Sequence, residues 1–174
     1  TVTRRQRQMC IRDREWTELF IYKIGESSKV QKKAFEVLVI EDNNLNAFAA
    51  PGGIIGINAG LFRYSDNEAQ FASVVAHELA HLSQRHFARQ VLESSDRSNA
   101  SMATILASIV VAVATRSPAA VIGGQGLIAT QTLRYSRLYE TEADREGFLT
   151  LEKSGYQTKE TVSYTHLTLP TSHC

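Results

Sequence analysis

Two short apolar runs in the first third of the chain predict β-strands. Residues 34–42 (AFEVLVIED) are rich in apolar and β-branched residues, which is typical of a buried strand. Residues 53–62 (GIIGINAGLF) predict a second strand, and its glycines allow another backbone to come close. The passage between them, NNLNAFAAPGG, is rich in turn-forming residues and predicts a loop.

A long amphipathic segment follows and predicts the main helix. Residues 65–94 carry apolar residues at helical spacing along one face. Ser65, with Glu68 three residues later, forms a capping-box signature, so we expect the helix to begin there. The apolar stripe consists of Val75, Leu79 and Leu82.

Three further segments also have helical character. Residues 15–28 and 136–154 are amphipathic, and Gly155 is expected to end the second of these helices. Residues 102–114 (MATILASIVVAVA) are strongly apolar, but the run is shorter than the roughly 20 residues of a membrane span. We interpret it as a buried or lid helix; the alternative is an element at the membrane surface.

The two ends of the chain differ from the rest. A DNA strand that encodes RRQRQMCIRD, near the N-terminus, has a reverse complement that can encode VSYTHLTLPT, near the C-terminus. Such a pair is expected of one sequencing adaptor translated in both directions. We therefore predict that residues 1–14 and 161–174 are non-native tails and that residues 15–160 form a single domain.

Setting the tails aside changes the charge and the available metal ligands. The whole chain has a net charge of +1, whereas residues 15–160 hold 14 basic and 17 acidic residues, a net charge of −3. The arginines of the first tail are therefore no sign of nucleic-acid binding. Both cysteines, Cys10 and Cys174, lie in the tails, which excludes a disulfide framework or a thiolate metal site from the domain. Three of the five histidines remain: His77, His81 and His86.

Two of these histidines form a metal-binding motif. His77, Glu78 and His81 have the spacing HExxH on the predicted main helix. Residues four apart lie on the same helical face, so the two imidazoles can bind one ion. Glu78 lies at the edge of that face, where it can act as a general base on a water at the metal. A chance match is the alternative, but two histidines and a glutamate at fixed spacing are rare in a chain of this composition.

The third histidine is predicted to lie outside the site. His86 follows His81 by five residues and is therefore about 140° further round the helix. A metzincin would carry a glycine and a third histidine where this chain has Gln84 and Phe87, so that class is excluded. We interpret His86 as a polar or packing residue near the helix end.

The third ligand therefore has to be a carboxylate. The stretch YSRLYETEADREG offers two pairs four residues apart, Glu140 with Asp144 and Glu142 with Glu146. Packing favours the first pair, because Glu140 shares a face with Gly147 and small residues let helices lie close. Asp144 would then accept a hydrogen bond from the N–H of a ligating imidazole without binding the metal itself. Glu142 points about 160° away from Glu140, towards solvent.

Three ordered motifs carry a likeness to a known family. They are NAFAAPGGIIGINAGL, QFASVVAHELAH and SRLYETEADREGFLTLEKSGY. Together they resemble the HtpX/BepA/CAAX-prenyl-protease family of zinc metallopeptidases, family M48, and most closely its periplasmic BepA-like branch. The likeness covers nearly all of residues 15–160.

The resemblance implies a ligand set and a fold. It implies that His77, His81 and Glu140 bind one Zn²⁺, that Glu78 is the catalytic base and that Asp144 supports the site from outside. The fold that it implies is an α+β, zincin-like (gluzincin) domain, mostly helical, with a small mixed sheet beside the active-site cleft.

The resemblance also places the segments around the cleft. The strand that holds Gly53, Ile55, Gly56 and Asn58 would border the cleft, and an extended substrate would pair with its edge. Residues 102–128 would fall in a helical lid region. The oxyanion of the reaction needs a further donor, and the sequence offers three polar candidates: Asn46, Tyr135 and Arg137.

The expected function is zinc-dependent hydrolysis of peptide bonds in quality control of the bacterial cell envelope. Unfolded or misassembled envelope proteins are the expected substrates, in the periplasm or at the membrane, and nucleic acid is not an expected partner. One alternative is a chaperone or assembly factor with the same fold and metal but little proteolysis. Another is a zinc hydrolase with a different substrate. The complete set of ligands and base favours catalysis.

Overall fold

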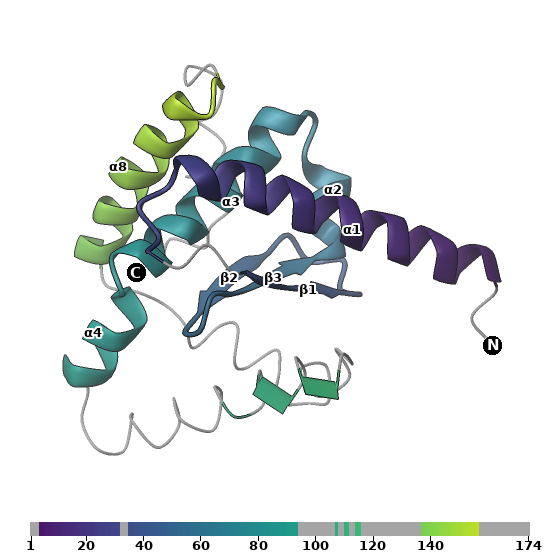
Figure 1. Ribbon diagram of the computed structural model, residues 1–174, viewed down its shortest axis with the longest axis horizontal. Coiled ribbons are helices and arrows are strands. Elements are labelled where there is room, and N and C mark those ends of the chain that lie inside the picture. The colour runs from purple at the N-terminus through teal and green to yellow at the C-terminus, as the bar shows by residue number, and fades with distance from the viewer. Residues whose placement is uncertain are drawn as a thin grey trace.

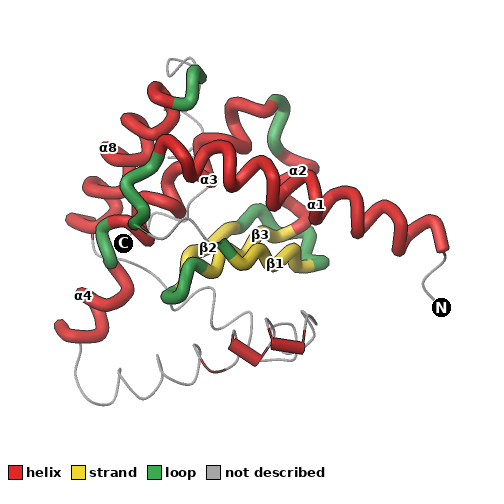
Figure 2. The backbone as a smooth tube through the Cα atoms, viewed as in Figure 1, coloured by secondary structure: helices red, strands yellow, loops and turns green. Residues whose placement is uncertain are grey.

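The computed structural model describes residues 4–31, 35–93, 107, 110–111, 114–115 and 137–156 (Figure 1). In these residues a small sheet lies beneath helices that cover one of its faces (Figure 2). The described part is mostly helical with a mixed sheet, which confirms the α+β class expected from the sequence.

The sheet has three strands in the order β1-β3-β2. Strand β1 (Glu36–Ile40) runs parallel to β3 (Ile54–Asn58), and β2 (Ala47–Ala50) runs antiparallel to β3. A tight turn joins β2 to β3, and its two glycines, Gly52 and Gly53, adopt φ angles of 90° and 84° that favour glycine.

The loop predicted between the two apolar runs was wrong, because it contains β2. Its sequence, AFAA, is alanine-rich and has little intrinsic strand propensity. Pairing with β3 through the glycine turn makes it a strand. The apolar run before it forms β1 as predicted. The second run forms β3, but its last residues belong to helix α2 (Ala59–Tyr64).

This topology corrects the expectation for the cleft-bordering strand. β3 is paired on both sides, and all of its residues are buried. A substrate therefore cannot pair with an edge formed by Gly53, Ile55, Gly56 and Asn58. Among the described strands, the edges of the sheet are β1 and β2.

The predicted main helix is divided into two. Helix α3 (Glu68–Ser83) is followed by α4 (His86–Glu93), and Arg85 between them has a positive φ of 53°. The predicted start was also wrong, because the Asn67 side chain accepts the 2.9 Å hydrogen bond from Gln70 N. Ser65 instead follows α2, where its Oγ donates to Leu61 O at 2.7 Å.

The last described helix, α8 (Arg137–Lys153), agrees closely with its prediction. Gly155, at φ 84°, ends it. Gly155 N donates to Glu152 O and Tyr156 N donates to Leu151 O, both at 3.1 Å, which is the Schellman pattern of helix ends. α8 packs mainly against α3, far from it in sequence.

Helix α1 (Arg4–Ser27) completes the described core. It covers the predicted helix of residues 15–28 except for the last residue, and it begins within the segment predicted to be non-native. Its buried apolar residues, Phe20, Ile21 and Ile24, pack with Phe71 and Val75 of α3 in one cluster beside the sheet.

Residues 161–174 and most of residues 102–128 lie outside the described residues, and so does the prediction of a lid. The described residues of the apolar run 102–114, Val110 and Val111 among them, are helical but exposed, so the alternative of a buried helix is not supported there. Among the helices that are described, none combines the length and the apolar character needed to cross a membrane.

Candidate metal centre

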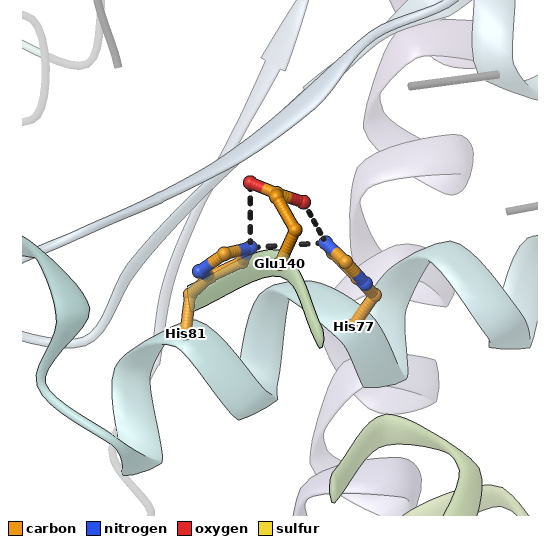
Figure 3. Close-up of side chains that lie close together, drawn as sticks. All are labelled: His77, His81 and Glu140. Atoms are coloured by element: carbon orange, nitrogen blue, oxygen red, sulfur yellow. Dashed lines mark hydrogen bonds and ion pairs between the residues drawn. The ribbon is translucent and has the colours of Figure 1, made fainter. Parts of the chain in front are cut away.

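Three side chains converge between α3 and α8 (Figure 3). Nε2 of His77 lies 2.9 Å from Nε2 of His81. The carboxylate of Glu140 faces both rings, with Oε2 3.2 Å from His77 Nε2 and Oε1 3.8 Å from His81 Nε2. These are the residues that the sequence proposed as ligands, and the structure brings them together.

The helices explain why these side chains meet. His77 and His81 lie one turn apart on α3 and are buried, whereas Glu140 is in the first turn of α8 with a half-buried side chain. Gly147 lets α8 come close to α3, because a Cβ at this position would lie only 3.1 Å from the backbone N of His77. The small residues of α8 thus face α3, as the packing argument from the sequence predicted.

The donor set fits a divalent metal ion. Ligands about 2.0–2.1 Å from a tetrahedral ion lie about 3.3 Å from one another. The three separations around the site, 2.9, 3.2 and 3.8 Å, are close to that spacing. Two imidazoles and one carboxylate are also a ligand set that zinc commonly has in catalytic sites.

Glu78 is buried beside this group. Burial raises its pKa to about 7, although the positive charge of His77 opposes the shift. The backbone N–H of Ala49 donates a hydrogen bond to the carboxylate. Asn58 N donates to Asn46 O at 3.0 Å, and because strand residues alternate, the Ala49 peptide group points away from β3. β2 therefore turns its outer edge towards Glu78.

Asp144 lies behind His77, as the sequence predicted from the helical face. Its Oδ1 is 2.9 Å from His77 Nδ1. Burial lowers the pKa of His77, but the hydrogen bonds to Asp144 and Glu140 outweigh burial and raise this pKa to about 10. Burial, and then the positive charge of His77, lower the pKa of His81. In the metal-free protein the positive charge therefore resides on His77.

Two residues lie closer to the site than the sequence predicted. His86 is fully buried, as expected of a packing residue, but it also contacts the site, since its Nδ1 lies 2.8 Å from His81 Nδ1. Glu142 does not simply face solvent, because its Oε2 lies 3.0 Å from His86 Nε2 and accepts a hydrogen bond from Arg89 at 2.7 Å. Burial lowers the pKa of His86, and the hydrogen bond from Arg89 lowers that of Glu142, so the imidazole is neutral and the carboxylate ionised near pH 7.

The division of the helix is the reason for these errors. The angle of about 140° between His81 and His86 holds only on a continuous helix. The positive φ of Arg85 turns the chain so that His86 faces His81 again. The polar run SQR, which ends α3 and leads into α4, is the sequence signal that could have indicated the break.

The three residues proposed as donors to the oxyanion differ in position. Asn46 immediately precedes β2, and Arg137 is exposed at the start of α8. Tyr135 lies outside the described residues.

Residues 12–173 match the sequence pattern of peptidase family M48. The chain belongs to peptidase family M48. This confirms the family resemblance of the three motifs, and the family implies a bound metal. His77, His81 and Glu140 are a group in this chain that can hold one.

The names of several similar proteins are consistent with this family. A Vibrio cholerae protein, provisionally named a beta-barrel assembly-enhancing protease, is 38% identical over 147 residues, 82% of this chain and 30% of its own length. The Beta-barrel assembly-enhancing protease of Escherichia coli K12 is 37% identical over 127 residues, 72% of this chain and 26% of its own. The Mitochondrial metalloendopeptidase OMA1 of Arabidopsis thaliana is 29% identical over 130 residues, 75% of this chain and 25% of its own.

The chain spans between about a quarter and a third of the length of these relatives. The family and the names of these relatives support a metalloprotease.

Proposed function

We propose that this chain holds the catalytic domain of a zinc-dependent metalloendopeptidase, within residues 15–160. The observation that carries the proposal is the convergence of His77 Nε2, His81 Nε2 and the Glu140 carboxylate, with Glu78 buried beside them. Two histidines from an HExxH helix and a glutamate from a second helix are the ligand set of a gluzincin-type zincin.

Each residue of the site then has a role in peptide hydrolysis. When bound, zinc supplies a Lewis acid that activates a water and polarises the scissile carbonyl. Glu78 takes the proton of the attacking water and delivers it to the leaving amine, for which a pKa of about 7 is well suited. The N–H of Ala49 orients the Glu78 carboxylate. Asp144 holds Nδ1 of His77, which keeps Nε2 directed at the metal.

The substrate is proposed to bind along β2. This strand contacts α3, and the peptide groups of Ala47 and Ala49 point away from β3. An extended polypeptide can pair with such an edge through its backbone, which makes recognition tolerant of side chains. Profiling with a peptide library should therefore give cleavage at many different sequences. A narrow consensus would contradict binding through the backbone.

The biological role is proposed from the relatives. Proteins named beta-barrel assembly-enhancing proteases support a role in quality control of the bacterial cell envelope. Unfolded or misassembled envelope proteins, in the periplasm or at the membrane, would be the substrates. A chaperone with the same fold would not need a buried carboxylate with a raised pKa at the metal, so Glu78 favours catalysis.

Digestion of an unfolded protein tests this function. The full chain loaded with zinc should cleave casein, should lose this activity in the presence of a strong chelator and should regain it when zinc is restored. If the zinc-loaded protein gives no cleavage products but suppresses aggregation of an unfolded protein, the proposed protease activity is wrong and the chaperone alternative is supported.

A further inference from the structure

His81 has a neighbour at each of its ring nitrogens. Its Nε2 faces His77 and Glu140, and its Nδ1 lies 2.8 Å from Nδ1 of His86. His86 is fully buried, and its second nitrogen, Nε2, lies 3.0 Å from Oε2 of Glu142. A line of polar contacts therefore runs from the candidate metal centre through His86 to α8.

We propose that His86 is a positioning residue of the metal centre, whose Nδ1 accepts the Nδ1 proton of His81 and so leaves Nε2 of His81 free to bind the metal. This rests on the metal centre proposed above. A neutral imidazole carries one proton, so a ring that binds a metal through Nε2 carries it on Nδ1. His86 can accept that proton's hydrogen bond only with its own proton on Nε2, where the Glu142 carboxylate accepts it in turn.

Carboxylates of α8 thus orient both histidine ligands, one by direct contact and one through a third residue. Asp144 of α8 contacts His77 directly, at 2.9 Å. Glu142, two residues earlier on α8, reaches His81 only through His86. Such outer partners fix the ring orientation of a ligand and strengthen metal binding.

The packing around His86 fixes its ring in this place. The ring stacks on Tyr139, with centroids 4.7 Å apart and planes 14° from parallel. Arg89 lies over the same tyrosine, 4.4 Å from the ring centroid, and donates to Glu142 at 2.7 Å. Tyr139 directly precedes Glu140, so the partners of His86 belong to the turn of α8 that supplies the third ligand.

The backbone gives an independent indication. Arg85 has a φ of 53°, a left-handed conformation that is strained for a residue with a side chain. This turn is what directs His86 back towards His81, and strained backbone is often retained where a function requires it.

Two substitutions of His86 separate positioning from packing. His86→Phe keeps a flat ring on Tyr139 but has no acceptor for His81. His86→Asn loses the ring but places an amide oxygen near the position of Nδ1. Ala88→Ser, on the exposed face of α4, is the matched control. The measurements on the full chain are zinc affinity, by competition with a chelator, and the absorption spectrum of the Co²⁺-loaded protein.

His86→Phe should weaken zinc binding by about 10- to 100-fold and alter the Co²⁺ spectrum. His86→Asn should recover part of the affinity, and Ala88→Ser should match the parent. If His86→Phe does not fold, Glu142→Ala decides instead, since it removes the outer acceptor at a partly exposed position and should also weaken binding. Unchanged affinity and an unchanged spectrum in the folded variant would overturn the proposal.

The ring proton of His86 can also be located directly. Nitrogen-15 NMR of the zinc-loaded chain should show His86 protonated at Nε2, and protonation at Nδ1 would overturn the proposal. A parent chain that binds no zinc refutes the metal centre itself. If the parent binds one zinc and substitution of His86 or Glu142 leaves its zinc affinity unchanged, only the positioning role is refuted.

Discussion

At the scale of single residues, the site depends on where its protons reside. The raised pKa of His77 and the lowered pKa of His81 place one positive charge on His77 when no metal is bound. Asp144 and Glu140 stabilise that charge. A metal ion has to replace the proton, so metal binding and proton release are linked.

We therefore expect zinc binding to release about one proton at pH 8. The pKa of His77 is about 10, so the ring is still protonated at this pH and has to lose its proton to bind. The apparent affinity should rise about tenfold for each pH unit between 7 and 9. Calorimetry in buffers with different ionisation enthalpies measures the release. Asp144→Asn should reduce the number of protons released. A binding enthalpy that does not depend on the buffer would contradict the raised pKa of His77.

The choice among the acidic residues of α8 gives a second prediction. Glu140→Ala removes a donor that lies between the two histidines, so the protein should lose stoichiometric zinc. Glu142→Ala leaves all three donors in place and should still bind one zinc, although more weakly. Metal analysis after dialysis distinguishes the two variants, and the reverse result would contradict the assignment of the ligand.

The sequence was informative about individual residues where a helix continues without interruption. The spacing on one helical face selected Glu140 and Asp144 over Glu142 and Glu146, and the structure places the first two at His77. The same reasoning failed for His86, because it assumed that the helix continued through Arg85.

At the scale of elements, patterns with strong periodicity or an end signal were predicted well. Apolar spacing predicted β1 and α8, and Gly155 marked the end of α8. The helix of the HExxH motif was predicted as a helix, but its start and its length were wrong. β2 was missed because its short, alanine-rich sequence becomes a strand only through pairing with β3. The division between α3 and α4 was missed because an arginine, not a glycine, occupies the left-handed position.

This left-handed residue makes the turn between α3 and α4 testable. Arg85→Gly relieves the positive φ, whereas Gln84→Gly places glycine where φ is −84° and glycine only adds freedom to the unfolded chain. We expect the first variant to exceed the second by about 1 kcal/mol in free energy of unfolding, measured with urea. Equal stabilities would argue against strain at Arg85.

At the scale of the whole molecule, the part of α1 whose burial is described, from Arg14 onward, contributes five buried residues to the core. They are Thr17, Phe20, Ile21, Ile24 and Gly25. Arg14 contributes a partly exposed ion pair with Glu18, of a kind that is worth under about 1 kcal/mol. The helix is continuous from Arg4, and the α1 residues described in the apolar cluster with α3 belong to its second half.

Removal of residues 1–14 should therefore leave zinc affinity unchanged and lower the melting temperature by only a few degrees. Thermal unfolding and chelator competition on the shortened and the full chain measure the two quantities. Loss of the folded state on shortening would contradict the interpretation of this segment as a non-native tail.

The central claim is that this site binds zinc and uses Glu78 to hydrolyse peptide bonds. The most direct measurement determines zinc content and casein cleavage in the same samples of the parent and of Glu78→Gln. The parent should hold one zinc and cleave, whereas the variant should hold one zinc and cleave at least about 100-fold more slowly, because only the general base has been removed. Equal cleavage by the two proteins, with equal zinc, would contradict the claim.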